Sequence, residues 1–235
     1  AQACATVWYR FEEGTANAAA TGPGALTDFA GDSPHGTPLR DPVYRADAPA
    51  AIVQALGAPN RLSLELNCGQ SAVFGLPFIF HREYGDATLE FFLKVPNQDH
   101  RSIFWTRAGN TDANRFNIAI NANGGFGFDY RSPSGAIHVS DAALSLFFIP
   151  LDSWHHIAIV RSGVTYQFYL DGVFQTSRTD SSPDLPTSDK WSISGRSGYR
   201  LFGLIDEIRF SDCALLPSRF LIAQVDQADG PEPSP

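Results

Sequence analysis

The sequence has no methionine, no Asn-X-Ser/Thr glycosylation site and no apolar run long enough to cross a membrane. A membrane helix needs about 18 apolar residues, whereas the most apolar stretches, 72–80 and 143–151, are short and contain Pro or Gly. Only 18% of the residues are charged and 12% are aromatic, which excludes a disordered or coiled-coil chain. The net charge of −8 argues against nucleic acid or an anionic membrane surface as the main partner.

Methionine is also missing from position 1, where the chain opens with Ala1-Gln2-Ala3. Small residues of this kind follow a signal-peptide cleavage site. We therefore expect a processed protein that is secreted and acts outside the cell or at the cell surface. An artificial truncation would leave the same start.

Cysteine is scarce, with three in 235 residues, and the spacing matches neither a zinc site nor a redox motif. Cys4 precedes the first expected strand and Cys213 follows the last one, so a Cys4–Cys213 disulfide becomes possible if the terminal strands pair. Cys68 would then be a buried thiol. The alternative is three reduced, buried cysteines.

Short alternating or apolar runs separated by turn residues make up the chain after about residue 60. Two pairs of runs are joined by Ser162-Gly163 and Asp171-Gly172, which is a strong hairpin signal. Many short strands with almost no helical periodicity are typical of an antiparallel sandwich. Only residues 215–224 could form a short helix. The expected strands are 6–12, 61–66, 71–74, 88–95, 102–107, 115–121, 126–130, 137–139, 155–161, 165–170, 173–177, 191–194 and 203–210.

We expect one domain over residues 1–225, because β-sandwiches of about 200–250 residues routinely fold as one unit. Within it, residues 14–59 are rich in Ala, Gly, Pro and Asp and lack periodicity, which predicts a long loop. A loop of this length needs an additional interaction to be ordered. Residues 226–235 are polar and Pro-rich, and we expect a flexible tail.

Three segments together resemble the laminin-G-like (LamG) family. Residues 154–160 (WHHIAIV) and 168–172 (FYLDG) resemble its W-H-X-V-A run and Y-V-D-G hairpin, and residues 203–210 (GLIDEIRF) resemble its closing G-X-I-D-E-V-R-I-Y strand. Residues 9–14 (YRFEEG) and 28–36 (DFAGDSPHG) resemble its opening Y-X-F-D-E-G and D-X-X-G-N-X-X-H-G motifs. The resemblance implies an all-β fold, a concanavalin A-like jelly-roll sandwich of two antiparallel sheets.

The likeness covers about residues 5–222 and has three departures. Glu12 replaces the usual Asp, Asp32 replaces the usual Asn, and residues 16–26 form a longer insert. The first two fall in the segments where the family places a structural calcium.

The resemblance implies a Ca²⁺ in this region, and the residues suggest ligands. Since alternate residues of a strand share a face, we expect Asp206 on the apolar face with Ile208 and Phe210. A carboxylate there must be paired, protonated or bound to a cation. The candidate calcium ligands are Glu13, Asp28, Asp32 and Asp206, with the hard oxygen atoms that Ca²⁺ prefers. Alternatively, Asp206 caps a turn or pairs with an Arg, and Asp28 and Asp32 are solvated.

Catalytic motifs are weak. The Glu-X-Asp-X-X-Glu spacing of laminarinase-like glycosidases, which would place two carboxylates on one face, does not occur. His155, Arg161 and Gln167 could take the roles of an alginate-lyase-like site, but packing and hairpin hydrogen bonding explain them as well. We expect no enzymatic activity.

A sugar-binding surface needs aromatic faces with amide and guanidinium donors nearby. Two regions have this composition, one around 103–123 and one around 191–200. The candidate ligand-binding residues are Trp105, Arg107, Asn117, Trp191, Arg196 and Tyr199. The alternative is that both tryptophans are core residues and the asparagines form turns.

Residues 230–234 (GPEPS) resemble the P-E-P motif of the bacterial PEP-CTERM sorting signal, without the membrane helix and Arg cluster that follow it there. That resemblance implies a bacterial source. We expect a non-catalytic recognition or adhesion module whose partner is a glycan or an extracellular matrix component. The alternative is a structural subunit of an extracellular filament or larger assembly, and a polysaccharide lyase or hydrolase comes third.

Overall fold

The computed structural model describes residues 4–31, 35–50, 59–67, 69–75, 85–96, 101–106, 114–138, 145–181, 190–194 and 200–222. Over these residues the chain forms strands and a short 3₁₀ turn, η2 (Pro217–Arg219), and no helix among them is long and apolar enough to span a membrane. The strands are β1 (Ala5–Tyr9), β2 (Thr37–Leu39), β3 (Val43–Arg45), β4 (Ser63–Leu66), β5 (Ser71–Phe74), β6 (Ala87–Lys94), β7 (Arg101–Thr106), β8 (Arg115–Ile120), β9 (Gly125–Arg131), β10 (Ile137–His138), β11 (Phe147–Phe148), β12 (His155–Ser162), β13 (Thr165–Leu170), β14 (Val173–Thr179), β15 (Trp191–Ile193) and β16 (Gly203–Ser211).

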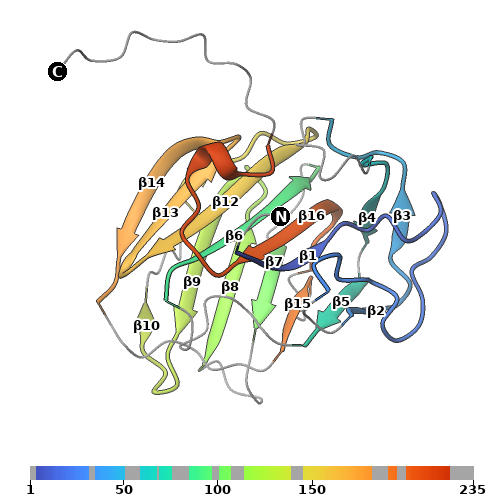
Figure 1. Cartoon of the computed structure of the whole chain (residues 1–235). Coiled ribbons are helices and arrows are strands. Elements are labelled where there is room, and N and C mark those ends of the chain that lie inside the picture. The colour runs from blue at the N-terminus through green and yellow to red at the C-terminus, as the bar shows by residue number, and fades with distance from the viewer. Residues whose placement is uncertain are drawn as a thin grey trace, which may run out of the picture.

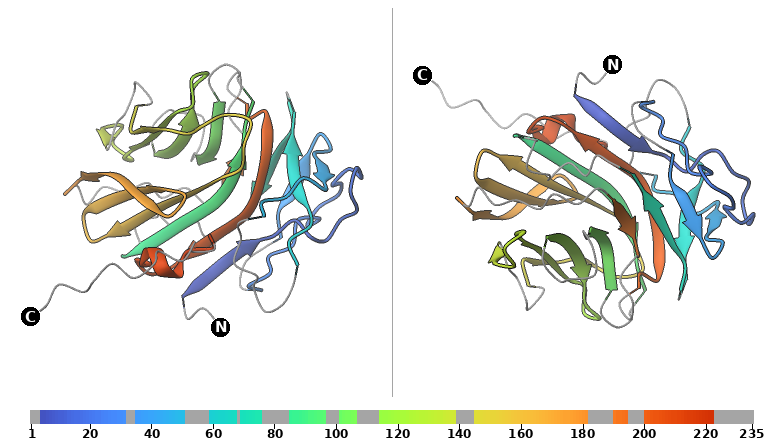
Figure 2. Two further views of the ribbon diagram at one scale, coloured as in Figure 1. Left: turned by 90° about the horizontal axis from the view of Figure 1, so that it is seen from above. Right: turned by 90° about the horizontal axis from the view of Figure 1, so that it is seen from below.

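The strands form two antiparallel sheets that lie face to face as two layers (Figures 1 and 2). The first, which we call the β6 sheet, has the order β14-β13-β12-β6-β16-β4-β3, with β1 also paired to β16. The second, the β8 sheet, has the order β10-β9-β8-β7-β15-β5-β2, with β11 also paired to β9. This arrangement confirms the predicted all-β jelly-roll sandwich.

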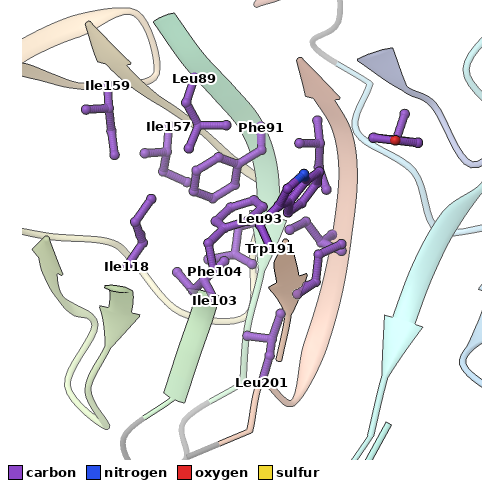
Figure 3. Close-up of a cluster of buried hydrophobic side chains, with 14 of the residues drawn as sticks. Leu89, Phe91, Leu93, Ile103, Phe104, Ile118, Ile157, Ile159, Trp191 and Leu201 are labelled. Carbon is purple, nitrogen blue, oxygen red and sulfur yellow. The ribbon is translucent and has the colours of Figure 1, made fainter. Parts of the chain in front are cut away.

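The hydrophobic core lies between the two sheets, because alternate residues of each strand point to the same face. Leu89, Phe91 and Leu93 of β6 extend from one layer toward Phe104 and Ile118 of the other (Figure 3). All five side chains are buried. Strand alternation thus explains how these five side chains meet in the core.

The outer face of β6 is also buried, although the sequence predicts no cover for it. Phe92 packs there with Trp8 of β1 and with Leu221, which follows η2. Glu90, on the same face, accepts a hydrogen bond from the backbone N–H of Leu221. The chain after β16 therefore folds back over the β6 sheet.

The two predicted hairpins are present, with one shift of a residue. Asp171 and Gly172 both have positive φ, 50° and 77°, as the tight turn that suits β-hairpins requires. The other turn lies at Gly163 and Val164, because Ser162 still pairs with Thr165 in the ladder.

The predicted loop over residues 14–59 contains two strands that the sequence did not reveal. β2 pairs with β5 and β3 pairs with β4, so backbone pairing orders this segment. Each strand has three residues, too few for a recognisable period. In the segment expected to be helical, the described part contains only η2, which begins at Pro217.

A disulfide joins Cys4 and Cys213, with an S–S distance of 2.00 Å. It forms because β1 pairs with β16 in the register that sets Ala5 opposite Ser211. This is one of the two arrangements that the sequence left open. Cys68 and the predicted tail, 226–235, lie outside the described residues.

Candidate functional site

One side of β16 is paired by two strands in succession. β1 pairs with residues 208–211 and β4 pairs with residues 203–205, which leaves Asp206 and Glu207 at the junction between them. The ladder to β6 has a register shift between Asp206 and Arg209, and Glu207 has a φ of 50°. Two buried carboxylates therefore lie at a β-bulge.

The bulge overturns the predicted facing of Asp206. Ile205 and Ile208, three residues apart, both belong to the main core, so alternation breaks between them. Asp206 stands opposite Phe92, whose side chain lies in the outer cluster with Trp8. Asp206 is thus on the outer side of the β6 sheet and not with Ile208 and Phe210.

The two carboxylates of the junction have different partners. Glu207 accepts hydrogen bonds from Arg10 Nε, at 3.0 Å, and from the Trp8 indole. Asp206 accepts from Asn60 Nδ2 at 2.9 Å and from the backbone N–H of Glu207 at 2.8 Å. Burial raises the pKa of Glu207 to about 7 against the opposing effect of Arg10, and burial together with the Glu207 charge raises the pKa of Asp206 well above its usual value.

Glu13 and Asp28 lie further along the same edge of the sandwich. Asp28 Oδ1 accepts from the backbone N–H groups of Trp8, at 2.7 Å, and Ala30, at 3.1 Å. Glu13 Oε1 accepts from the Thr27 N–H and the Tyr44 hydroxyl, each at 3.3 Å. Although Glu13 is an exposed residue, the chain around its carboxyl partly removes it from water and raises its pKa.

These positions bear on the expected calcium site. Within the described residues, no group of three or more His, Cys, Asp or Glu side chains is placed to hold a metal ion. Glu13, Asp28 and Asp206 each have separate hydrogen-bond partners, and Asp32 lies outside the described residues. The structure thus places three of the four candidates on one edge without joining them in a single cluster.

An open cavity of about 390 Å³ lies at this edge, within the size range of small-ligand sites. Phe29, which is 44% exposed, forms one wall. The Arg10 guanidinium lies 5.1 Å from the centre of the Phe29 ring, and Trp8 packs edge-on against that ring. The lining residues are Arg10, Glu12, Glu13, Thr27, Phe29, Pro59 and Arg61.

The cavity is not predicted by the sequence, although two of the segments that form it carry motifs. The motifs at 9–14 and 28–36 predict metal binding, whereas in the structure Arg10 and Phe29 of these segments line the cavity. The third segment, 59–61, is held there by Glu12, whose Oε1 accepts from the N–H groups of Arg61 and Leu62, both at 2.7 Å. The proximity of residues 10–13 to residues 59–62 depends on strand order, which no local pattern reports.

Two other predicted ligand-binding residues, Trp105 and Asn117, lie on the outer face of the β8 sheet. They stand opposite each other in the ladder between β7 and β8. Asn117 donates to Asp129 Oδ1 at 2.8 Å, and the Arg115 guanidinium lies 4.7 Å from the Trp105 ring centre. Trp105 is nearly fully buried and so is not an open aromatic platform.

Trp191 is a core residue, contrary to its prediction as a ligand contact. It is 2% exposed and stacks on Phe74 with ring centroids 4.0 Å apart, and Figure 3 shows it between the layers beside Leu93 and Phe104. The remaining candidates, Arg107, Arg196 and Tyr199, lie outside the described residues.

His155 takes part in a Ser-His-Asp chain of hydrogen bonds. Its Nε2 lies 2.8 Å from Ser153 Oγ and its Nδ1 lies 2.7 Å from Asp171 Oδ2. Asp171 Oδ1 also accepts from the His156 N–H, so this carboxylate ties the start of β12 to the turn after β13. At 41% side-chain exposure Asp171 is open to water, unlike the buried Asp of a hydrolytic triad. We therefore assign these three hydrogen-bonded side chains a structural role.

Comparison with a family model gives a match over residues 78–219, to Laminin_G_3, described as the concanavalin A-like lectin/glucanases superfamily. Comparison with curated proteins gives no match.

Solved structures share the fold at low sequence identity. Domain 4 of AbnA, a GH43 extracellular arabinanase from Geobacillus stearothermophilus, in complex with arabinotriose, is 17% identical with a TM-score of 0.63, over 92% of this chain and 96% of that one. The binding domain of botulinum neurotoxin serotype D is 13% identical with a TM-score of 0.56, over 92% of this chain and 50% of that one. A structure of botulinum neurotoxin type C, whose cell entry is described as dependent upon interaction with two ganglioside molecules, is 10% identical with a TM-score of 0.57, over 92% of this chain and 49% of that one. The chain thus spans about half the length of the toxin domains.

Proposed function

Because the chain belongs to the concanavalin A-like lectin/glucanase superfamily, we propose that it is a non-catalytic extracellular module that recognises carbohydrate. The cavity beside Phe29 carries this proposal. Similar structures include a domain in complex with arabinotriose and a toxin described with gangliosides, and these relatives support the ligand class and the extracellular setting.

The cavity has the chemistry that sugar binding requires. Sugars present apolar C–H faces and polar hydroxyl rims, so their sites combine an aromatic wall with a few placed hydrogen-bonding groups. Phe29 offers the wall, and Arg10, Arg61, Glu12 and Glu13 offer donors and acceptors around it. The pairing of Arg10 with Glu207 fixes one of these groups in advance, which lowers the entropy lost on binding.

Replacing the aromatic wall is expected to weaken binding. We expect Phe29→Ala to reduce affinity by about twofold to tenfold, since an aromatic contact contributes about 0.5–1.5 kcal/mol. Isothermal titration with arabinotriose, xylotriose, cellotriose and mannotriose measures it.

Phe174→Ala is the matched control, because Phe174 is similarly exposed but lies on β14 at the far edge of the β6 sheet. Absence of binding to every neutral oligosaccharide, on these probes and on a glycan array, would contradict the proposal. Release of reducing ends or unsaturated products from a polysaccharide would contradict its non-catalytic part.

A structural Ca²⁺ is a separate proposal for the same edge, with Glu13, Asp28, Asp32 and Asp206 as candidate ligands. Carboxylate oxygens suit this ion, and a cation would relieve the raised pKa values of Glu13 and Asp206. Asn60 Oδ1, on the residue that donates to Asp206, is buried without a hydrogen-bond partner, which fits an oxygen available to a cation. The oxygen atoms of these residues are the hard ligands that Ca²⁺ prefers, although the described candidates do not form a cluster of three or more.

Removal of the ion is expected to lower the melting temperature. A cation present at about 100 times its Kd stabilises the fold by about 2.7 kcal/mol, which corresponds to roughly 5–10 °C for a domain of this size. Thermal melts with and without excess chelator, followed by addition of Ca²⁺ or Mg²⁺, measure the effect. A melting curve that excess chelator leaves unchanged counts against the calcium site.

A further inference from the structure

Two arginine side chains lie against Gly69, in the turn between β4 and β5. A Cβ atom added to Gly69 would lie 3.1 Å from Arg40 Nη1 and 3.3 Å from Arg200 Nη1, so the two guanidinium groups meet beside the same glycine. Arg200 Nη1 also donates to the Gly69 carbonyl oxygen. Gly69 has a φ of 102°, which glycine adopts without a steric penalty, and its missing side chain leaves room for both groups.

Three segments that are distant in the chain meet at this place. Arg40 follows β2, Gly69 lies between β4 and β5, and Arg200 precedes β16. Gln70, next to Gly69, donates from its Nε2 to the Asp41 carbonyl oxygen at 2.6 Å. Side-chain hydrogen bonds to the backbone thus join the turn at Gly69 to the segments that carry both arginines.

The surroundings of the two arginines do not neutralise their charge. Among the residues that the structure describes, no acidic side chain forms an ion pair with Arg40 or Arg200, and the Gly69 carbonyl is the one hydrogen-bond acceptor of their guanidinium groups. The described residues 39–42, 69–70 and 200–202 contain a single acid, Asp41. Since like charges at short range repel each other, an anion placed between the arginines would stabilise the pair.

Both guanidinium groups are open to a ligand. Arg40 is an exposed residue and Arg200 is partly exposed. Nε and Nη2 of Arg200 have no hydrogen-bond partner among the described residues, and neither nitrogen is a buried atom. A negatively charged group that reaches Arg40 therefore finds further free N–H donors on Arg200.

We propose that Arg40 and Arg200 together bind the acidic group of a glycan, a carboxylate or a sulfate. Each guanidinium presents its N–H donors in a planar fork that matches a pair of oxygen atoms on either group. The inference rests on the proposed carbohydrate recognition, but neither arginine lines the cavity beside Phe29. The arginine pair favours acidic glycans, and the cavity binds neutral sugar.

The test compares charged polymers with neutral ones of the same backbone. Polygalacturonate is paired with its methyl ester and dextran sulfate with dextran, and isothermal titration measures each affinity at physiological ionic strength. We expect at least one charged polymer to bind about tenfold more tightly than its neutral partner. Arg40→Gln should remove most of that preference, and Arg40→Lys, which keeps the charge but not the fork, should restore only part of it.

Arg178→Gln is the matched control, because Arg178 is also exposed but lies on β14 and bonds only to Thr176 and Ser177 of its own strand. Preference for one charged polymer alone identifies the bound group as carboxylate or as sulfate. Equal losses in the Arg40 and Arg178 variants, or no charge preference in the wild type, overturn the inference. In that case, neutral-sugar binding that Phe29→Ala weakens would show that the proposed function still stands.

A double variant tests whether the two arginines act on one group. If they do, their effects are coupled, and Arg40→Gln combined with Arg200→Gln should lose less affinity than the product of the two single losses. Independent effects would overturn the assignment of both residues to one site. Because Arg200→Gln also removes the bond to Gly69, thermal melts check that this variant is folded, and the exposed Arg40 decides the test if it is not.

Discussion

Replacing Glu90 by Gln is expected to destabilise the protein by about 3–5 kcal/mol, the cost of removing one partner from a buried ion pair. Glu90 lies on the outer face of β6 and is fully buried. One carboxylate oxygen accepts two hydrogen bonds from the Arg209 guanidinium. The other lies 2.9 Å from His156 Nε2 and 2.7 Å from the N–H of Leu221.

An amide at position 90 cannot satisfy these partners. Its NH₂ group would face donors on whichever side it was turned, either the Arg209 guanidinium or the Leu221 N–H. The Arg209 charge, which is itself fully buried, would then lose its counter-charge. The contact that holds the segment after η2 against the β6 sheet would weaken too.

Denaturant unfolding measures the loss, and Glu65→Gln is the matched control. Glu65 forms a hydrogen-bonded pair with Arg45, but both side chains are partly exposed, so that variant should lose no more than about 1 kcal/mol. Equal, small losses in the two variants would show that the Glu90 network does not stabilise the fold.

The Glu90 effect should also depend on pH. Burial raises the Glu90 pKa, but the His156 hydrogen bond and the Arg209 charge outweigh burial and hold the pKa below its usual value of 4.5. The stabilisation is therefore present above about pH 4.5 and is lost as the pH falls through the lowered pKa. The difference between wild type and Glu90→Gln should shrink in acid.

Asp206 and Glu207 are expected to give the opposite pH dependence. At low pH both carboxyls are protonated in the folded and in the unfolded protein, so they do not lower the free energy of unfolding. Above about pH 4 the unfolded chain releases these protons while the folded protein retains them, so the free energy of unfolding decreases as the pH rises. For Glu207 alone, a shift from 4.5 to about 7 corresponds to a loss on the order of 3 kcal/mol.

Asp206→Asn should therefore flatten the profile and stabilise the protein at pH 8, because the folded protein no longer holds a second buried carboxylate beside Glu207. The amide that this substitution introduces can still accept from the Glu207 N–H. Its NH₂ group would face Asn60 Nδ2, which now donates to Asp206, and can donate to Asn60 Oδ1 once the Asn60 amide turns over. Glu207 would keep Arg10 as its counter-charge and lose the neighbouring acid.

Urea unfolding from pH 4 to pH 8 in excess chelator measures this effect without competition from a cation. Asp47→Asn is the control, because the Asp47 carboxyl should change the pH dependence of stability in the opposite direction. Hydrogen bonds from Lys94 and Trp154 outweigh burial and lower the Asp47 pKa. An Asp206→Asn protein that is less stable at pH 8, with an unchanged pH slope, would show that Asp206 is ionised and well satisfied.

Local patterns in the sequence determined the fold class and much of the strand order along the chain. Alternating apolar residues mark β12, β13 and β16. Asp171-Gly172 marks the turn between β13 and β14, because positive φ at consecutive residues suits few residue types. The opening and closing motifs also located the edge where the cavity lies. All of these are properties of neighbouring residues.

The tertiary structure decided which side chains meet, because pairing joins residues far apart in the chain. A single extra residue at the β16 bulge moved Asp206 away from the face that strict alternation assigns to it. Trp191 and Trp105 look alike in sequence, yet one stacks in the core and the other lies beneath Arg115. The meeting of Arg40 and Arg200 at Gly69, and the approach of residues 10–13 to 59–62, follow from sheet order and could not be deduced from composition or periodicity.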